Sequence, residues 1–269
     1  MATTPLPLSD LDISALPLEK VAFFLDFDGT LADFADDPAA VILPAAEKKS
    51  LETISRATGS AVAIVSGRSI SDLERFLAPL HFPLAGVHGL ERRNARGETL
   101  RMPLDEAGLQ KAKSRLRAFT LGHAGILAEE KPGSIALHYR KRPELEAPCM
   151  ATARAIVAEN PGLKLLHGKM VIEIKAGHAT KADAIRAFMQ EYPFKGRHPV
   201  FAGDDATDED AFPAVDALGG TSIKVGHGPT RAAYRAANID EFRSWLDRAA
   251  SSFVDNDTRT EAGGPDGES

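Results

Sequence analysis

Two carboxylates, those of Asp26 and Asp28, follow an apolar run in the stretch V21-A-F-F-L-D-F-D-G-T30. The run predicts a buried strand, and Gly29 predicts a tight turn at its carboxyl end, where active sites lie in open parallel sheets. Because side chains alternate along an extended chain, we expect Asp26 and Asp28 to point the same way and Phe27 the opposite way. Two like charges in one small space need a cation or a shared proton. The pair therefore indicates a divalent metal site or a nucleophile with its acid, unless the acidic turn only ends the strand.

Three further groups of polar side chains stand at predicted strand ends or helix starts: Ser66 in S66-G-R68, Lys181, and Asp204, Asp205 and Asp208 in G203-D-D-A-T-D208. Oxygen ligands from two strand ends suit Mg²⁺. A carboxylate beside that ion can attack phosphorus while Ser66 and Lys181 hold the transferring oxygens, and Asp28 can protonate the leaving alcohol and then activate water. Singly, each group also has a structural explanation, as a helix cap, a solvated lysine or an acidic N-terminal turn. Their combination favours phosphoryl chemistry.

Strands and helices alternate in the parts of the chain that must position these groups. We expect strands from Val21 and at 61–65, 84–89, 199–202 and 222–225, and helices at 44–56, from Ser69, and at 181–190, 229–234 and 239–249. Alternation at this spacing predicts a doubly wound α/β sheet.

The pattern changes between about residues 91 and 175. There we expect a hairpin at 91–101, helices at 106–121 and 144–159, and strands at 126–131, 134–140, 163–167 and 169–175. Consecutive hairpin-like strands predict a small antiparallel sheet with two helices, inserted between the halves of the main domain. The predicted organisation is a lead-in at 1–20, a core at 21–104 and 177–250, an inserted domain at 105–176 and a disordered acidic tail at 251–269.

Composition indicates an ordinary globular protein, with 43% hydrophobic residues and a net charge of −6 to which residues 251–269 contribute most. No basic patch predicts nucleic-acid binding, and no apolar run predicts a membrane span or a signal peptide. The single cysteine, Cys149, fits a reducing compartment, so a cytoplasmic location is expected. The sequence does not reveal the oligomeric state, although a monomer is favoured.

The order D26-x-D28-G-T, Ser66, Lys181 and G203-D-D-x-x-D208 resembles that of the haloacid dehalogenase superfamily of phosphohydrolases. Over residues 21–248 the chain resembles, within that superfamily, the trehalose-6-phosphate phosphatase family. The motifs that carry this resemblance are S66-G-R68, G86-V-H-G-L-E91, E129-E-K131 with H138-Y-R140, G168-K-M-V-I-E173 and G203-D-D-A-T-D-E-D-A-F212. It implies a Rossmann-like core with an inserted smaller α/β cap domain and a sugar phosphate as substrate.

The resemblance also implies residue roles. Asp26 would be the nucleophile that forms a phosphoaspartyl intermediate, and Asp28 the general acid and base. Mg²⁺ would be bound by Asp26, the backbone carbonyl of Asp28 and Asp204, with Asp208 and Asp205 positioning its waters. Within S66-G-R68, Gly67 and Arg68 are predicted to bind substrate.

Side-chain alternation in the inserted domain predicts one charged and one apolar sheet face. The charged face could be plain solvent-exposed surface, as in many half-buried antiparallel sheets. The family resemblance instead implies contact with the glucose rings of the substrate. The residues it marks for this role are Glu129, Lys131, Arg140, Lys169 and Glu173, while Glu130 points the other way.

Three other functions fit parts of this pattern. A phosphoryl-transferring mutase would need to protect its phosphoenzyme from water. A related phosphatase acting on sucrose phosphate or mannosyl phosphoglycerate would share the core and differ in the inserted domain. A non-catalytic sugar-phosphate sensor would have no chemical need for both Asp26 and Asp28.

Overall fold

A computed structural model describes residues 4–12, 20–35, 38–102, 104–131, 133–168, 170–177 and 179–261. The chain forms two compact units. We call them the core unit, Met1–Leu100 with Thr180–Ser269, and the inserted unit, Arg101–Ala179. No described helix is both long and apolar enough to cross a membrane.

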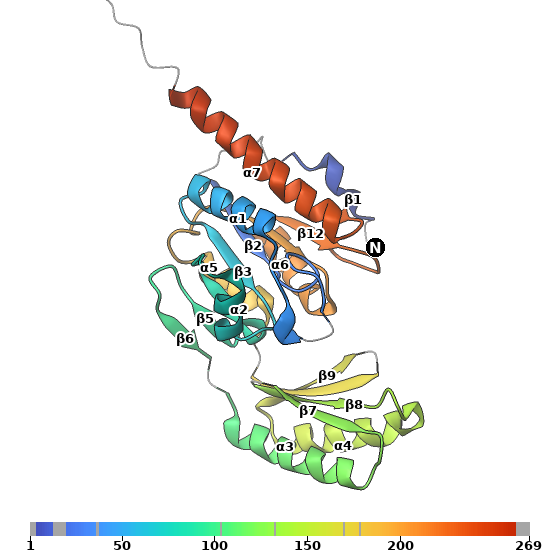
Figure 1. The fold of residues 1–269 in the computed structure, drawn as a ribbon. Coiled ribbons are helices and arrows are strands. Elements are labelled where there is room, and N and C mark those ends of the chain that lie inside the picture. Colours follow the sequence, from blue (N-terminus) through green and yellow to red (C-terminus); the bar gives the residue numbers. More distant parts are fainter. Residues whose placement is uncertain are drawn as a thin grey trace, which may run out of the picture. The chain divides into compact units, whose positions relative to one another are not determined.

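A nine-stranded sheet runs through the core unit (Figure 1). In order across the sheet its strands are β1 (Leu6–Pro7), β13 (Tyr234–Ala236), β12 (Thr221–Val225), β11 (His198–Gly203), β2 (Val21–Leu25), β3 (Val62–Val65), β4 (Leu84–Gly86), β5 (Glu91–Arg93) and β6 (Thr99–Arg101). From β1 to β4 in this order, each strand is parallel to its neighbour, whereas β5 is antiparallel to β4. The carboxyl ends of β2 and β11, which precede the acidic motifs, therefore lie next to each other.

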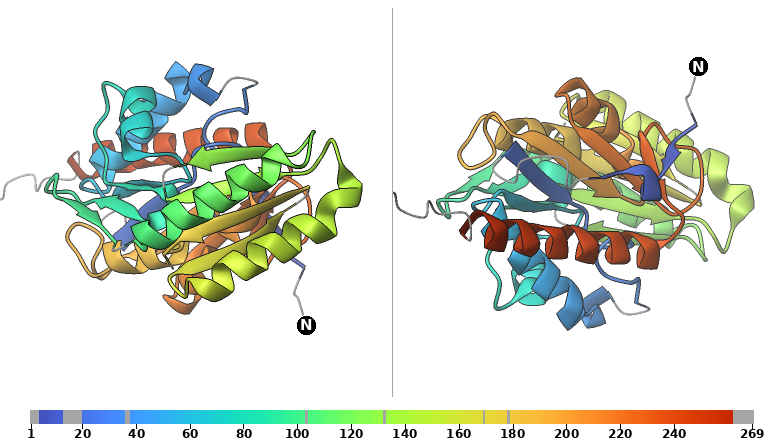
Figure 2. Two further views of the ribbon diagram at one scale, coloured as in Figure 1. Left: turned by 90° about the horizontal axis from the view of Figure 1, so that it is seen from below. Right: turned by 90° about the horizontal axis from the view of Figure 1, so that it is seen from above.

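Helices cover both faces of this sheet, as the burial of every residue of β2 requires. Phe23 and Leu25 pack into one apolar cluster with α1 (Ala45–Ala57), α2 (Ile70–Leu77) and α7 (Ile239–Glu261). Ala22 and Phe24 pack into a second cluster with α5 (Lys181–Phe188) and α6 (Ala211–Ala217). Helices α1 and α7 lie side by side in both Figure 1 and Figure 2. The predicted doubly wound α/β fold is confirmed.

The inserted unit is a four-stranded antiparallel sheet with two helices on one face (Figure 2, left). Its elements are α3 (Glu106–Leu121), β7 (Leu127–Lys131), β8 (Ser134–His138), α4 (Glu146–Glu159), β9 (Leu163–Gly168) and β10 (Val171–Ala176). Ile135, Leu137, Ile172 and Ile174 are buried in its core, so the predicted apolar face packs against the helices. The predicted smaller α/β insertion is present and lies, in the sequence, between the two segments that form the core unit.

Short 3₁₀ segments complete the described structure. They are η1 (Leu8–Asp10), η4 (Pro38–Ala40), η5 (Val87–Gly89), η6 (Pro143–Leu145) and η7 (Ala206–Asp208). The strand expected at 84–89 is shorter than predicted, because it ends at Gly86 where η5 begins.

Near both ends of the chain, some helices and strands differ from those that the sequence predicts. Within the expected lead-in, Leu6 and Pro7 pair with β13, so part of this segment belongs to the core sheet. The helix expected at 229–234 is absent, and Tyr234–Ala236 forms β13 instead. Helix α7 continues to Glu261, so residues 251–261 of the expected disordered tail are helical, and 262–269 lie outside the described residues.

Candidate active site

Asp26 and Asp28 lie directly after β2, at the carboxyl edge of the core sheet. The backbone N–H of Asp26 donates to Ala202 O at 2.9 Å, which extends the pairing with β11. Phe27 points the other way and stacks on Phe76 with ring centroids 5.5 Å apart. Gly29 has φ 77°, and a Cβ on it would lie 2.3 Å from Asp204 Oδ2, so only glycine fits at this turn.

Lys181 connects this turn to the second acidic motif. It is the first residue of α5, and a capping box between Thr180 and Asp183 fixes where that helix begins. Its Nζ donates to Asp26 Oδ1 and to Asp208 Oδ1, both at 2.7 Å, and its side chain is only 2% exposed. Burial alone would lower the pKa of Lys181, but the carboxylates of Asp208 and Asp26 raise it above its ordinary value. The lysine therefore stays charged and binds the nucleophile candidate from one side.

Three carboxylates, those of Asp26, Asp204 and Asp208, offer oxygens that all lie within 4.8 Å of one another. Burial raises the pKa of Asp26 well above its usual value, against the opposing effect of Lys181. Burial and then Asp208 raise the pKa of Asp204 to about 6. Asp204 Oδ1 is buried and accepts no hydrogen bond from the described part of the chain. This excess of buried carboxylate oxygen over positive charge fits a hard divalent cation such as Mg²⁺.

Asp205 is not brought into this trio. It is exposed and caps η7, where its Oδ1 accepts from the backbone N–H of Ala206 at 2.6 Å. Its own N–H donates to Asp208 Oδ2 at 2.9 Å, so it helps to orient Asp208.

Arg68 makes a bidentate ion pair with Asp28. Its Nε donates to Oδ2 and its Nη2 to Oδ1, both at 2.7 Å, and this pairing raises the pKa of Arg68. The pair fixes the orientation of the predicted acid and base. Sequence reasoning assigned Arg68 to the substrate and missed this contact.

Ser66 lies between β3 and α2 and is 1% exposed. Its Oγ accepts from the backbone N–H of Arg68 at 3.2 Å. Helix α2 is capped by Ser69, whose Oγ accepts from Asp72 N at 3.1 Å. The buried hydroxyl of Ser66 is therefore held next to Gly67 at the edge of the same sheet.

A strained loop follows β4 and contacts the Ser66 loop. Val87 and His88 have φ values of 49° and 56°, and Gly89 has 100°. For a β-branched residue such as Val87 this conformation costs about 1–3 kcal/mol, and such strain persists mainly at functional sites. The motif G86-V-H-G-L-E91 carried part of the family resemblance, but no residue in it was assigned a role.

Arg243 of α7 holds the turn after Asp28. Its Nε and Nη2 donate to Leu31 O at 3.1 and 2.9 Å, and its Nη1 donates to Asp33 Oδ2 at 3.0 Å. Local sequence patterns give no sign of this contact, because Arg243 and Leu31 are 212 residues apart.

On the inserted unit, Glu129 and Glu173 flank Ala136 on one sheet face. Ser134 Oγ donates to Glu173 Oε1 at 2.5 Å, and Glu129 Oε2 pairs with His138 Nε2 at 2.8 Å. The predicted charged face therefore has ordered carboxylates.

The other predicted sugar-binding positions are less well defined. Arg140 is exposed in the turn beyond β8 rather than in the strand. Lys169 and the side chain of Lys131 lie outside the described residues. Glu130, which was left out of the prediction, pairs with Lys113 and Arg117 of α3, on the helix side.

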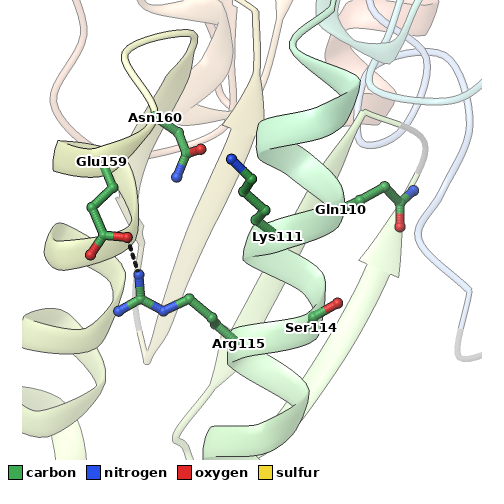
Figure 3. A pocket seen from close by; sticks show the side chains of 6 residues that line it. All are labelled: Gln110, Lys111, Ser114, Arg115, Glu159 and Asn160. Carbon is green, nitrogen blue, oxygen red and sulfur yellow. Dashed lines mark hydrogen bonds and ion pairs between the residues drawn. The ribbon is translucent and has the colours of Figure 1, made fainter.

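A hollow in the core unit lies beside the carboxylate trio, whereas a hollow on the inserted unit contains none of the predicted site residues. One of about 280 Å³ in the core unit is lined by Gly29, Phe34 and Asp204, next to the carboxylate trio. A larger one of about 440 Å³ lies between α3 and α4 of the inserted unit (Figure 3). Its lining includes the Arg115–Glu159 ion pair, with 2.7 Å between the atoms, and none of the predicted site residues. Of these two hollows, only the smaller one adjoins the carboxylate trio.

Known proteins resemble this chain over most of its length. A family model described as trehalose-phosphatase matches residues 24–241. The trehalose-6-phosphate phosphatase of Escherichia coli (strain K12) is 42% identical over 228 residues, which cover 85% of this chain and 86% of that protein.

Solved structures agree on the fold. The C-terminal domain of trehalose-6-phosphate phosphatase from C. albicans has 21% identity and a TM-score of 0.76, with 93% of this chain and 99% of that one covered. A haloacid dehalogenase-like hydrolase from B. subtilis has 12% identity and a TM-score of 0.61, with 86% and 99% covered. At these identities the two structures show the haloacid dehalogenase fold alone.

Proposed function

The chain belongs to the trehalose-phosphatase family of phosphoric monoester hydrolases, and from that premise we propose that it hydrolyses trehalose 6-phosphate to trehalose and phosphate. The observation that carries the proposal in this chain is the buried carboxylate of Asp26, held at 2.7 Å by Lys181 beside Asp204 and Asp208. A carboxylate with an ammonium partner at a sheet edge is equipped to attack phosphorus.

In the first step we assign Asp26 Oδ2 as the attacking atom, because Oδ1 already accepts from Lys181. The Asp26–phosphorus bond forms while the bond from phosphorus to the sugar oxygen breaks, and Asp28 gives a proton to that leaving oxygen. In the second step Asp28 takes a proton from water, which attacks phosphorus and releases Asp26 as a carboxylate. Ser66 and Lys181 hold the transferring oxygens.

Asp28 can act in this way only if it exchanges partners during turnover. Both of its oxygens are occupied by Arg68 at 2.7 Å. We propose that the leaving oxygen of the substrate displaces one of these two bonds, that the freed oxygen of Asp28 carries the proton that it gives to the leaving oxygen, and that Arg68 keeps the carboxyl group aligned through the other bond. Gly67 and Arg68 then border the bound phosphate, as the family resemblance implied.

We propose Mg²⁺ as the cofactor, because carboxylate and carbonyl oxygens are ligands that suit it. We propose that Asp26, Asp204 and the backbone carbonyl of Asp28 hold it, while Asp208, and Asp205 through Asp208, orient its surroundings. When bound, the ion neutralises charge on the phosphoryl oxygens. Asp204 Oδ1, which accepts no hydrogen bond from the described residues, supports this assignment.

The inserted unit supplies the proposed sugar specificity. Carboxylates and cations together can accept from and donate to sugar hydroxyls. We propose that Glu129 and Glu173 bind these hydroxyls together with Arg140, Lys131 and Lys169. The hydrogen bond from Ser134 fixes one oxygen of Glu173 and leaves the other for the sugar.

The decisive experiment measures phosphate release by the purified protein with Mg²⁺ on trehalose 6-phosphate, sucrose 6-phosphate, glucose 6-phosphate and p-nitrophenyl phosphate. We expect strong preference for trehalose 6-phosphate, loss of turnover in Asp26→Asn, and reversible loss with EDTA. Broad weak activity would contradict the substrate assignment, and substantial turnover by Asp26→Asn would contradict the covalent mechanism. Binding of the sugar phosphates without hydrolysis would support a sensor instead.

A further inference from the structure

Lys224 is a buried lysine within the core sheet. It lies in β12, between β11 and β13, and only 4% of it is exposed. Its neighbours Ile223 and Val225 pack into the apolar cluster on one face of the sheet, so alternation places Lys224 on the opposite face. The sequence predicts a strand at 222–225 and no role for this lysine. Because burial removes an ammonium group from water, its position in the strand needs a compensating interaction.

The ammonium group of Lys224 acts on one member of the carboxylate trio. Its Nζ donates to the backbone oxygen of Asp204. The register pairs Lys224 with Gly203, the last residue of β11, so the side chain reaches one residue beyond the end of that strand. Burial raises the pKa of Asp204 to about 6, and the positive charge of Lys224 opposes that rise. The lysine is therefore bound to the main chain of Asp204 and close to its carboxylate.

Satisfying this backbone oxygen does not by itself account for a lysine. A carbonyl at the end of a strand can accept from water or from an uncharged donor, and either costs less than burying an ammonium group. A charged donor forms a stronger hydrogen bond, and it therefore holds the peptide group more firmly. The peptide group that it holds here is that of a proposed metal ligand.

The carboxylate of Asp204 depends on its backbone for its position. Its Oδ1 is buried and accepts no hydrogen bond from the described residues, and its Oδ2 packs against the turn at Gly29. By contrast, Asp26 and Asp208 each accept a hydrogen bond of 2.7 Å from Lys181. The short side chain of an aspartate follows its main chain closely, so a shift of the Asp204 backbone would move its carboxylate out of the trio.

We propose that Lys224 is a positioning residue for the cation site, because its hydrogen bond to the backbone oxygen of Asp204 keeps that carboxylate beside the other two. This inference rests on the proposed phosphatase function and its metal site. Groups that orient metal ligands typically contribute about 10- to 100-fold to metal affinity. If Lys224 acted only through its charge, it would repel the cation, and its removal would strengthen binding. The direction of the change in Mg²⁺ affinity therefore distinguishes the two roles.

The experiment measures the binding of Mg²⁺ alone, without substrate. Trp245 is buried in the core unit, so its fluorescence follows unfolding in urea, and the rise in unfolding free energy with Mg²⁺ concentration yields the dissociation constant of the ion. We expect Lys224→Met, which keeps much of the side-chain length but no donor, to raise this constant by about 10- to 100-fold. Lys224→Arg, which keeps a charged donor, should retain part of the affinity. In turnover assays, raising the Mg²⁺ concentration should restore much of the phosphate release that Lys224→Met loses at low Mg²⁺.

Ser222→Ala is the matched control, because Ser222 is fully buried on the same face of β12. Its Oγ donates to Asp216 Oδ1 at 2.7 Å and accepts from Ala233 N at 2.9 Å, so the substitution destabilises the same strand without removing a contact of Asp204. We expect Ser222→Ala to unfold at a lower urea concentration and to bind Mg²⁺ with the wild-type dissociation constant. An unchanged or smaller constant in Lys224→Met would overturn the proposal, and so would an equal rise in Ser222→Ala.

Failure of the proposed function would give a different result. In that case Mg²⁺ would stabilise the wild type, but the wild type would not hydrolyse trehalose 6-phosphate, and the comparison of dissociation constants would still decide the role of Lys224. A wild type that Mg²⁺ does not stabilise would overturn both the proposed metal site and this inference.

Discussion

Replacing Lys181 by methionine should destabilise the core unit strongly. Methionine keeps much of the length of the side chain but removes two charge-assisted hydrogen bonds of 2.7 Å, to Asp26 and Asp208. These carboxylates are 4% and 0% exposed, so neither can recover its lost partner from bulk water. Breaking a buried ion pair by removing one partner costs about 3–5 kcal/mol. We expect the free energy of unfolding to fall by about that amount in EDTA.

Trp245 makes the measurement specific. It is the single tryptophan of the chain, is 4% exposed and packs in the core unit, so its fluorescence reports the unfolding of that unit in urea. Asp208→Asn and the double variant Lys181→Met/Asp208→Asn complete a mutant cycle. The double variant should lose less than the sum of the single losses, by at least about 1.5 kcal/mol, because it leaves one fewer buried charge unpaired.

Mg²⁺ provides the second test of the same reasoning. A cation bound by Asp26 and Asp204 should restore more stability to Lys181→Met than it adds to the wild type. A loss below about 1 kcal/mol in EDTA, in the range of an exposed pair, would refute the reasoning, as would an additive cycle.

Three other predictions concern sugar selectivity, the catalytic turn and pH. Glu173→Ala should lower kcat/KM for trehalose 6-phosphate by about 10-fold or more, while hydrolysis of p-nitrophenyl phosphate stays near the wild-type rate. Ser134→Ala should show a smaller loss with the same selectivity. Equal losses on both substrates would mean that Glu173 has a structural role instead. Arg243→Met should lower the free energy of unfolding by about 2 kcal/mol and reduce kcat, because Leu31 O loses both of the Arg243 N–H donors. An unchanged kcat would show that the turn after Asp28 keeps its conformation without these two hydrogen bonds. Burial lowers the pKa of His198 below 6.5, so the unfolded chain binds its proton first as pH falls, and stability should decrease below about pH 6.5. His198→Gln should lessen that decrease in urea titrations at pH 5.5 and 7.5, and identical pH dependence would contradict the assignment.

The parts of the fold that sequence could predict depend on local signals. The apolar run before Asp26 and the turn at Gly29 define β2 and its end from neighbouring residues alone. The start of α5 is encoded by the Thr180 and Asp183 capping box, which places Lys181 in the first turn. Because strand ends in a parallel sheet share one edge, local elements suffice to gather these side chains.

Contacts between distant segments could not be predicted in this way. Tyr234–Ala236 lies in an alanine-rich stretch that favours a helix, but it is a strand because it pairs with β12 on one side and Leu6–Pro7 on the other. The ion pair of Arg68 with Asp28 spans 40 residues and depends on how the loops after two strands meet. No periodicity encodes either pairing.

Geometry also separates the chemical from the structural explanations that the sequence left open. Ser66 is not needed as a helix cap, because Ser69 caps α2. Lys181 is not a solvated helix residue, because it is 2% exposed. The acidic turn does contain an N-cap, but Asp205 fills that role, whereas Asp204 has a buried oxygen that accepts no hydrogen bond from the described chain. Neighbouring residues thus meet two of these structural needs, which supports our proposal that Ser66, Lys181 and Asp204 belong to a site for a cation and a phosphoryl group.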